Sequence, residues 1–160
     1  MRLETPEARR RFARARVLRL ATTDEGGRPH LVPATFALTT PDGADAPDTL
    51  SGGPDTVVTA VDHKPKRHQD LKRLRNIHTN PAVSLLVDHY DEDWRQLWWV
   101  RADGRARIVP AEAAPERADP VRRLVEKYPQ YADQPPRGPV IAIEVTRWSG
   151  WAYAEEPAAR

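Results

Sequence analysis

The chain contains no cysteine, which excludes disulfides, thiolate catalysis and zinc sites built on cysteine. It also lacks any run of about 18 apolar residues, so we expect no transmembrane helix and no membrane partner. The arginine-rich start, MRLETPEARRRFARARV, has no apolar segment of the kind that a secretory signal needs. From these features we expect a cytoplasmic protein.

Other kinds of site are also missing. The formal net charge of +2 is too small to indicate a nucleic-acid partner. The five histidines show no H-E-x-x-H or related spacing, so we predict no metal site. No serine lies in a G-x-S-x-G sequence, and no acid–base pair stands out, so no catalytic residue can be named. Any chemistry should therefore come from a bound cofactor, which the protein positions.

The length of 160 residues is typical of one domain, and we expect residues 1–160 to form it. Residues 41–55 (PDGADAPDTLSGGPD) are poor in apolar side chains and rich in Pro, Gly and Asp, which predicts a long loop between strands. Residues 153–160 are expected to form a flexible tail.

Strands outnumber helices in the predicted order. Helices are expected over 5–14 (with Thr5 as N-cap), over 70–78 and over 119–128, and strands over 17–23, 30–38, 56–61, 83–89, 97–109 and 140–148. Pro33 inside the second strand indicates an edge, a bulge or another irregularity. Hairpins dominate and no G-x-G-x-x-G follows a strand, so we predict a mainly β antiparallel barrel with peripheral helices.

A dense basic segment follows the third expected strand. The chain has only four lysines against twenty-one arginines, and Lys64, Lys66 and Lys72 lie close together here. Point charges and forked guanidinium donors delivered to one place suit the phosphate or polyanionic tail of a cofactor. A solvated basic face is the alternative that composition leaves open.

Tryptophans form the second candidate feature. Trp98 and Trp99 are adjacent on one expected strand and therefore point to opposite faces, one toward the core and the other toward a pocket or a partner chain. In W-S-G-W (148–151), a glycine between two tryptophans lets the backbone come close to a flat group that the rings can flank. Packing in the core or in an interface is the alternative for each ring.

Four motifs taken together carry a family resemblance: K-P-K-R, L-x-R-L-R-N-I, D-H-Y-D-E-D-W and W-S-G-W. Over about residues 5–152 the chain resembles the pyridoxamine 5′-phosphate oxidase-like flavin/deazaflavin oxidoreductases. Within that group it is most similar to the class that uses coenzyme F420 and is found in actinobacteria. The loop at 41–55 is an insertion relative to this pattern.

The resemblance implies a homodimeric, FMN-binding-like split β-barrel with the cofactor in a groove between the subunits. The cofactor is F420, or alternatively FMN. The backbone of one expected strand would border the ring (Thr59, Ala60, Val61, Asp62), and basic and amide side chains would hold the phosphate and acidic tail (Lys64, Lys66, Arg67, Arg73, Asn76). A second strand would line the other side of the ring (Val32, Pro33, Ala34, Thr35), and three tryptophans would come from the partner subunit or close the pocket (Trp98, Trp148, Trp151).

The function implied is that of an F420-dependent reductase, which transfers a hydride between the reduced deazaflavin and a small unsaturated organic substrate. Two alternatives stay open. One is an FMN-binding flavoprotein resembling pyridoxamine phosphate oxidase, and the other is a non-catalytic protein that binds F420, FMN or haem. The sequence does not indicate the physiological substrate.

Overall fold

The computed structural model describes residues 1–40, 53–61 and 71–153. Its elements, in chain order, are α1 (Thr5–Arg14), β1 (Leu18–Thr23), β2 (Pro29–Ala34), β3 (Ala37–Thr39), β4 (Thr56–Ala60), α2 (Lys72–Thr79), β5 (Ala82–His89), the 3₁₀ turn η1 (Trp94–Gln96), β6 (Trp98–Val109), α3 (Ala114–Lys127), α4 (Gln130–Asp133) and β7 (Val140–Ala152).

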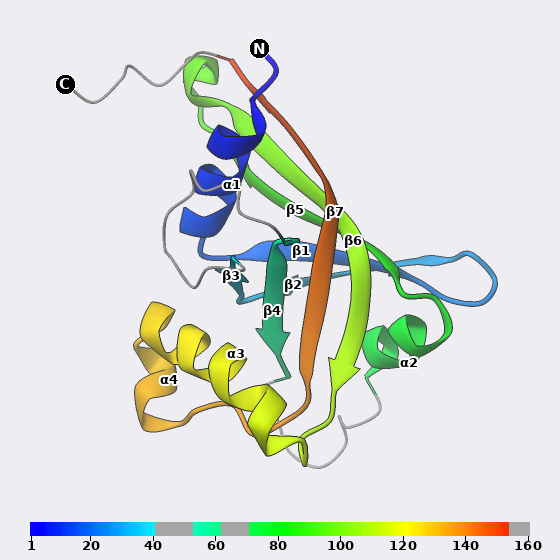
Figure 1. Ribbon diagram of the computed structural model, residues 1–160. Helices are drawn as coiled ribbons and strands as arrows, with labels where there is room; N and C mark the ends of the chain where they lie inside the picture. Colours follow the sequence, from blue (N-terminus) through cyan, green and yellow to red (C-terminus); the bar gives the residue numbers. More distant parts are fainter. Residues whose placement is uncertain (41–52, 62–70, 154–160) are drawn as a thin grey trace.

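The strands form one antiparallel sheet in the order β2-β1-β5-β6-β7-β4-β3. The two long strands, β6 and β7, pair along their whole length and run from one end of the molecule to the other (Figure 1). One half of the sheet is built on β6, which pairs with β5 through residues 98–105. The other half is built on β7, whose residues 140–144 pair with β4. The sheet therefore has two halves that share a central ribbon, which is the arrangement of a split barrel.

A bulge lies where the two halves meet. The β6–β7 register shifts between Asp103 and Gly104, so that Thr146 is the extra residue. A bulge of this kind bends the strand and increases its twist. A Cβ atom at Gly104 would lie 2.3 Å from the carbonyl oxygen of Glu144, so only glycine allows this close approach of the two strands.

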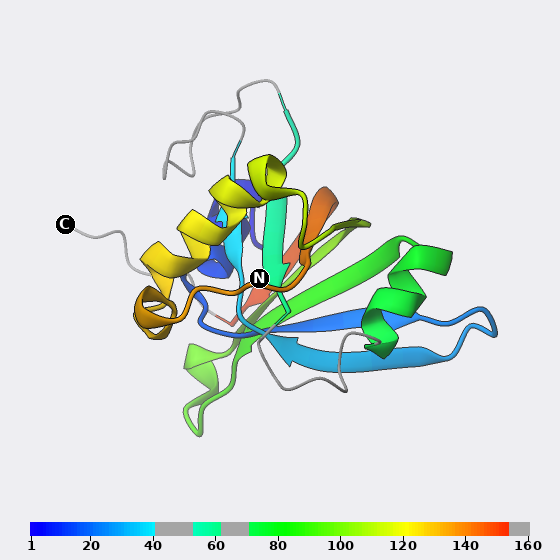
Figure 2. The same cartoon turned by 90° about the horizontal axis from the view of Figure 1, so that it is seen from below.

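The main core lies inside the curved sheet. Phe12 of α1 is fully buried and makes edge-to-face contacts with Phe36 (centroid distance 5.0 Å) and with Trp148 (5.1 Å). Helix α2 contacts β1 and β6, beside the β1–β2 hairpin (Figure 2). A smaller core lies on the other face of β4 and β7, where Leu124 of α3 and Tyr128, the residue after α3, cover it. Helices thus cover both faces of the β4 half of the sheet.

The structure confirms the mainly β antiparallel prediction. It also confirms that Pro33 lies on an edge strand, because β2 ends the order of the sheet and needs no backbone donor on its outer side. The expected strand over 30–38 is two strands, since Thr35 and Phe36 separate β2 from β3.

Three predicted element boundaries are wrong. Thr5 is the first residue of α1 rather than its cap, and Glu4 precedes it without a side-chain capping bond. Helix α3 begins at Ala114, where Pro115 and Glu116 favour a first turn, so Pro120 lies inside the helix. Strand β7 continues to Ala152, because residues 148–152 pair with β6.

Two further findings concern the described residues as a whole. Within 1–40, 53–61 and 71–153, no helix has the length and apolar character needed to cross a membrane. The same residues contain no group of three or more His, Asp or Glu side chains arranged to hold a metal ion.

Candidate functional site

The predicted ring-binding residues on β4 lie where its pairing is incomplete. Thr59, Ala60 and Val61 are buried. On one side β4 pairs with β7, and the N–H of Val61 donates to the carbonyl of Pro139 at 3.1 Å. In an antiparallel strand alternate residues direct their backbone groups to opposite sides, so those of Ala60 are directed away from β7. Among the described residues, β3 pairs with β4 only from Thr56 to Val58, so this edge is open at Ala60.

The predicted residues after β1 divide between two faces. Val32 and Ala34 pack against the main core, whereas Pro33 is exposed at the edge of the sheet. Thr35 is half-buried in the short link between β2 and β3. Continuing the β3–β4 register by two residues would bring Thr35 opposite Ala60, but the pairing itself ends at Ala37 and Val58. Val32 and Ala34 therefore serve the core, and Oγ1 of Thr35 lies 2.8 Å from the hydroxyl oxygen of Tyr131.

The predicted polar residues of α2 lie beside the β1–β2 hairpin. Asn76 is buried, and its Nδ2 donates to the hydroxyl of Thr22 at 3.0 Å, which fixes the helix to the sheet. Arg73 is half-buried on the same helix. The predicted residues Asp62, Lys64, Lys66 and Arg67 lie outside the described residues.

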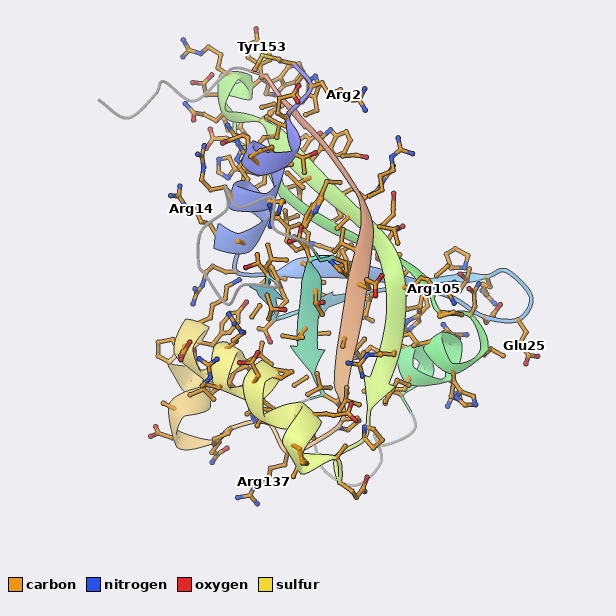
Figure 3. The ribbon with its side chains drawn as sticks, viewed as in Figure 1. Arg2, Arg14, Glu25, Arg105, Arg137 and Tyr153 are labelled. Carbon is orange, nitrogen blue, oxygen red and sulfur yellow. The ribbon has the colours of Figure 1, made fainter. Side chains whose placement is uncertain are left out.

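A cavity of about 370 Å³ separates α2 from the turn between β1 and β2. Its lining mixes Lys72 and Arg75 with Asp24 and Glu25, and Lys72 lies 3.7 Å from the Asp24 carboxylate. The backbone N–H of Arg28 donates to that carboxylate and holds the pKa of Asp24 below its usual value. Figure 3 shows Glu25 at the tip of the hairpin. Carboxylates on this wall offset its cations, so this cavity alone does not favour a polyanion.

Trp148 is a structural residue within its own chain. Its ring packs on Phe12, and its Nε1 donates to Asp55 at 2.9 Å. The other Asp55 oxygen accepts from the Arg9 guanidinium at 2.6 Å. This buried network joins α1, β7 and the residue that precedes β4.

Trp98 and Trp151 lie at the far end of the central ribbon from Ala60. Ala60 pairs with Val140 at the start of β7, whereas Trp151 is near its end, about 35 Å away along an extended strand. Trp98 packs toward the core, with the Arg11 guanidinium 5.5 Å from its ring centroid. These two tryptophans can reach a site at β4 only from a second chain.

Gly150, between the tryptophans of W-S-G-W, does allow a close approach. The group that approaches is Leu3 of the same chain, whose Cδ1 would lie 3.1 Å from a Cβ at that position. The N–H of Leu3 also donates to the carbonyl of Gly150 at 3.0 Å. The motif therefore seats the N-terminal segment on β7.

The residues predicted from the sequence do not include an apolar groove on the outer face of β1, β2, β5 and β6. The cavity measures about 570 Å³ and its lining includes Trp99, Leu31, Leu86 and Tyr90. Leu31 and Tyr90 are 65% and 70% exposed, which is unusual for large apolar side chains. The alternation of Trp98 and Trp99 indicated such a face, and Trp99 rather than Trp98 lies on it.

The junction between α3 and α4 holds one strongly perturbed group. Lys127 donates from Nζ to the carbonyls of Ala13 and Ala15, at 3.0 and 2.8 Å, and lies 3.7 Å from the Phe36 ring centroid. Burial, together with the nearby charge of Arg16, lowers the pKa of Lys127 to about 7. This lysine closes the C-terminal end of α1 rather than facing the open edge of β4.

The family model described as pyridoxamine 5′-phosphate oxidase matches residues 4–152. Similar solved structures include an FAD-binding protein from Mesorhizobium loti (TM-score 0.65, 20% identity, 94% of this chain and 95% of that chain). A second is a conserved hypothetical protein from Mycobacterium tuberculosis (TM-score 0.65, 19% identity, 99% of this chain and 92% of that chain). A third is the FAD-binding protein from Mycobacterium smegmatis (TM-score 0.54, 20% identity, 94% of this chain and 97% of that chain). No curated protein matches the chain.

Proposed function

The chain belongs to the pyridoxamine 5′-phosphate oxidase family, and from this premise we propose that it is an F420-dependent oxidoreductase acting on a small unsaturated organic substrate. One observation carries the proposal. The open backbone edge at Ala60 is followed directly in the sequence by the K-P-K-R segment and then by α2. In the sequence, a backbone edge that could bind a planar ring thus lies next to a cluster of basic residues.

The described residues fit the edge of a planar cofactor. The backbone groups of Ala60 offer a donor and an acceptor to the edge of a ring. Buried neighbours on β4 and β7 keep this edge dry, which strengthens hydrogen bonds made there. When bound, the reduced deazaflavin supplies a hydride from its C5 atom to the acceptor.

The positive charge of the segment after β4 favours F420 over FMN. Lys64, Lys66 and Arg67 provide several cations, and the polyanionic tail of F420 can use more of them than the single phosphate of FMN. The alternative is a flavin, because two similar structures are described as FAD-binding proteins. Under either cofactor the protein contributes position and electrostatics, and no side chain of the described residues is assigned a proton-transfer role.

We also propose that the protein acts as a homodimer. The outer groove exposes Leu31, Leu86 and Tyr90, and the same face carries the ion pair between Arg19 and Asp88 (3.3 Å). A face with both charge signs around an apolar centre can complement a second copy of itself across a two-fold axis. A second chain would also give Trp98 and Trp151 access to the open edge of β4.

The test of the cofactor is a fluorescence titration of the purified protein with F420, FMN and FAD in parallel. F420 should bind most tightly. Lys66→Ala and Arg67→Ala should each weaken F420 binding by about 1.5–3 kcal/mol, or roughly 10- to 150-fold. Arg14→Ala is the matched control, because Arg14 is exposed on α1, away from α2 (Figure 3). Unchanged affinity in both variants would mean that the basic segment is only a solvated surface.

Turnover separates an enzyme from a binding protein. Reduced F420 should be oxidised in the presence of a panel of unsaturated acceptors, whereas tight binding without turnover would favour a sequestering role. Sedimentation velocity at micromolar concentration tests the dimer. Leu86→Glu should yield monomers, and Val17→Glu, at an equally exposed apolar residue outside the groove, should not. A monomeric wild type would refute the shared site.

A further inference from the structure

Arg117 on α3 binds the link between α4 and β7. Its guanidinium donates from Nε and from one terminal nitrogen to the carbonyl of Gly138, at 3.1 and 2.9 Å, and the same terminal nitrogen donates to the carbonyl of Pro136 at 3.0 Å. The planar guanidinium presents several donors in a fixed geometry, so it can bind both carbonyls at once. Arg117 therefore holds the link onto α3.

The same link lies directly against the end of β4. A Cβ atom at Gly138 would lie 2.8 Å from the carbonyl oxygen of Val61 and 3.3 Å from its Cβ, so a glycine is needed for this close approach. The next residue, Pro139, accepts from the N–H of Val61 at 3.1 Å. The link that Arg117 holds therefore lies beside both backbone polar groups of Val61.

The orientation of Val61 determines that of Ala60. Neighbouring residues of an antiparallel strand direct their backbone groups to opposite sides, so Val61 held on the link keeps those of Ala60 directed away from β7. The bond to Pro139 extends the β4–β7 pairing, which otherwise ends at Ala60, by one residue. The end of a strand opens more readily than its middle unless other contacts hold it. Helix α3, which lies beside β4 (Figure 1), supplies such a contact through Arg117.

We infer that Arg117 is a positioning residue for cofactor binding. By holding Gly138 and Pro139 against Val61, it keeps the backbone donor and acceptor of Ala60 directed at the edge of the planar ring. The inference rests on the proposed function. It assigns a role in ligand binding to α3, an element that contains none of the site residues predicted from the sequence.

The first test is cofactor affinity in variants of Arg117. Arg117→Met keeps a long side chain and removes the three hydrogen bonds, so a smaller fraction of the free protein should present Ala60 correctly. Binding of F420, or of FMN if the wild type prefers it, should weaken roughly 3- to 10-fold, and the spectrum of the bound cofactor should shift. Arg117→Lys keeps the charge without the fork and should bind with intermediate affinity. In cofactor-free protein, NMR should show faster hydrogen exchange of the Val61 amide in Arg117→Met.

A double-mutant cycle tests whether Arg117 acts through the link. Gly138→Ala places a methyl group against the Val61 carbonyl and should also weaken cofactor binding. Without Arg117 the link can move away from that methyl group. The double variant Arg117→Met/Gly138→Ala should therefore lose less affinity than the product of the two single fold-changes.

Controls separate this role from a structural one. Arg122→Met removes an equal charge from an exposed position of α3, where Arg122 donates to Glu126 at 2.9 Å, and should leave cofactor affinity unchanged. If Arg117→Met does not fold, Arg117→Lys and Gly138→Ala provide the same comparison. A lower melting temperature with wild-type affinity, spectrum and Val61 exchange would overturn the inference alone, as would independent losses in the double variant. A wild-type protein that binds neither F420, FMN nor FAD would overturn both the inference and the proposed function.

Discussion

Asp55 is the acceptor through which α1 and β7 are joined just ahead of β4. One carboxylate oxygen accepts from Arg9 at 2.6 Å and the other from Trp148 at 2.9 Å. The side chains of the ion pair are only 8% and 11% exposed, so water cannot replace the carboxylate when it is removed. Asp55→Ala should therefore lower the free energy of unfolding by about 3–5 kcal/mol, which is typical when one partner of a buried pair is deleted.

A control substitution at an exposed ion pair separates the stability lost in Asp55→Ala from the effect of removing any charged side chain. Glu116 forms an exposed ion pair with Arg107, with side chains 62% and 66% exposed, and Glu116→Ala should cost less than about 1 kcal/mol. Adding Arg9→Met to Asp55→Ala should recover part of the loss, because the second change removes the buried guanidinium that had bound Asp55.

Urea unfolding followed by far-ultraviolet circular dichroism measures these differences without relying on Trp148, whose fluorescence the substitution itself would change. The denaturant slope should stay constant across the series, so that midpoints report stability. A loss in Asp55→Ala no larger than that in Glu116→Ala would refute the argument that burial makes this network important.

Three further predictions concern other parts of the fold. Gly104→Ala should destabilise the protein by roughly 1–3 kcal/mol in the same urea assay, because the added methyl would meet a backbone carbonyl oxygen at the bulge; an unchanged midpoint would mean that the strands separate at little cost. Asn76→Ala should cost roughly 1–3 kcal/mol in cofactor-free protein, because the buried Thr22 hydroxyl would lose its partner; a change seen only in cofactor affinity would instead assign Asn76 to the ligand. The pKa of Lys127 falls from 10.5 to about 7 on folding, so between these values the unfolded chain binds more protons and the free energy of unfolding should rise with pH. Urea unfolding at pH 7 and pH 9 should show a larger rise in the free energy of unfolding for the wild type than for Lys127→Met. An equal change with pH in the two proteins would contradict the prediction.

Local patterns predicted the elements well where one signal dominated. Alternating apolar residues located β5 and β6 to within about one residue. Pro33 indicated an edge, a bulge or another irregularity, and β2 is an edge strand. Competing signals caused the errors. Asp119-Pro120 looks like a helix start, but Pro115 and Glu116 start α3 earlier. The last strand was expected to end at Trp148, yet pairing with β6 keeps the rest of W-S-G-W extended as well.

For the candidate site as well, local sequence patterns predicted some features and contacts between distant residues decided the others. The sequence by itself determined the mainly β class, the absence of cysteine chemistry and the basic segment at 64–67, because composition and periodicity are local properties. Only the tertiary structure decided that the backbone groups of Ala60 are directed away from β7, that Trp98 and Trp151 lie at the far end of the ribbon, and that Tyr131 contacts Thr35 across 96 residues. Such contacts depend on strand register and on the bend at Gly104, and a pattern along the chain does not specify which distant residues those features bring together.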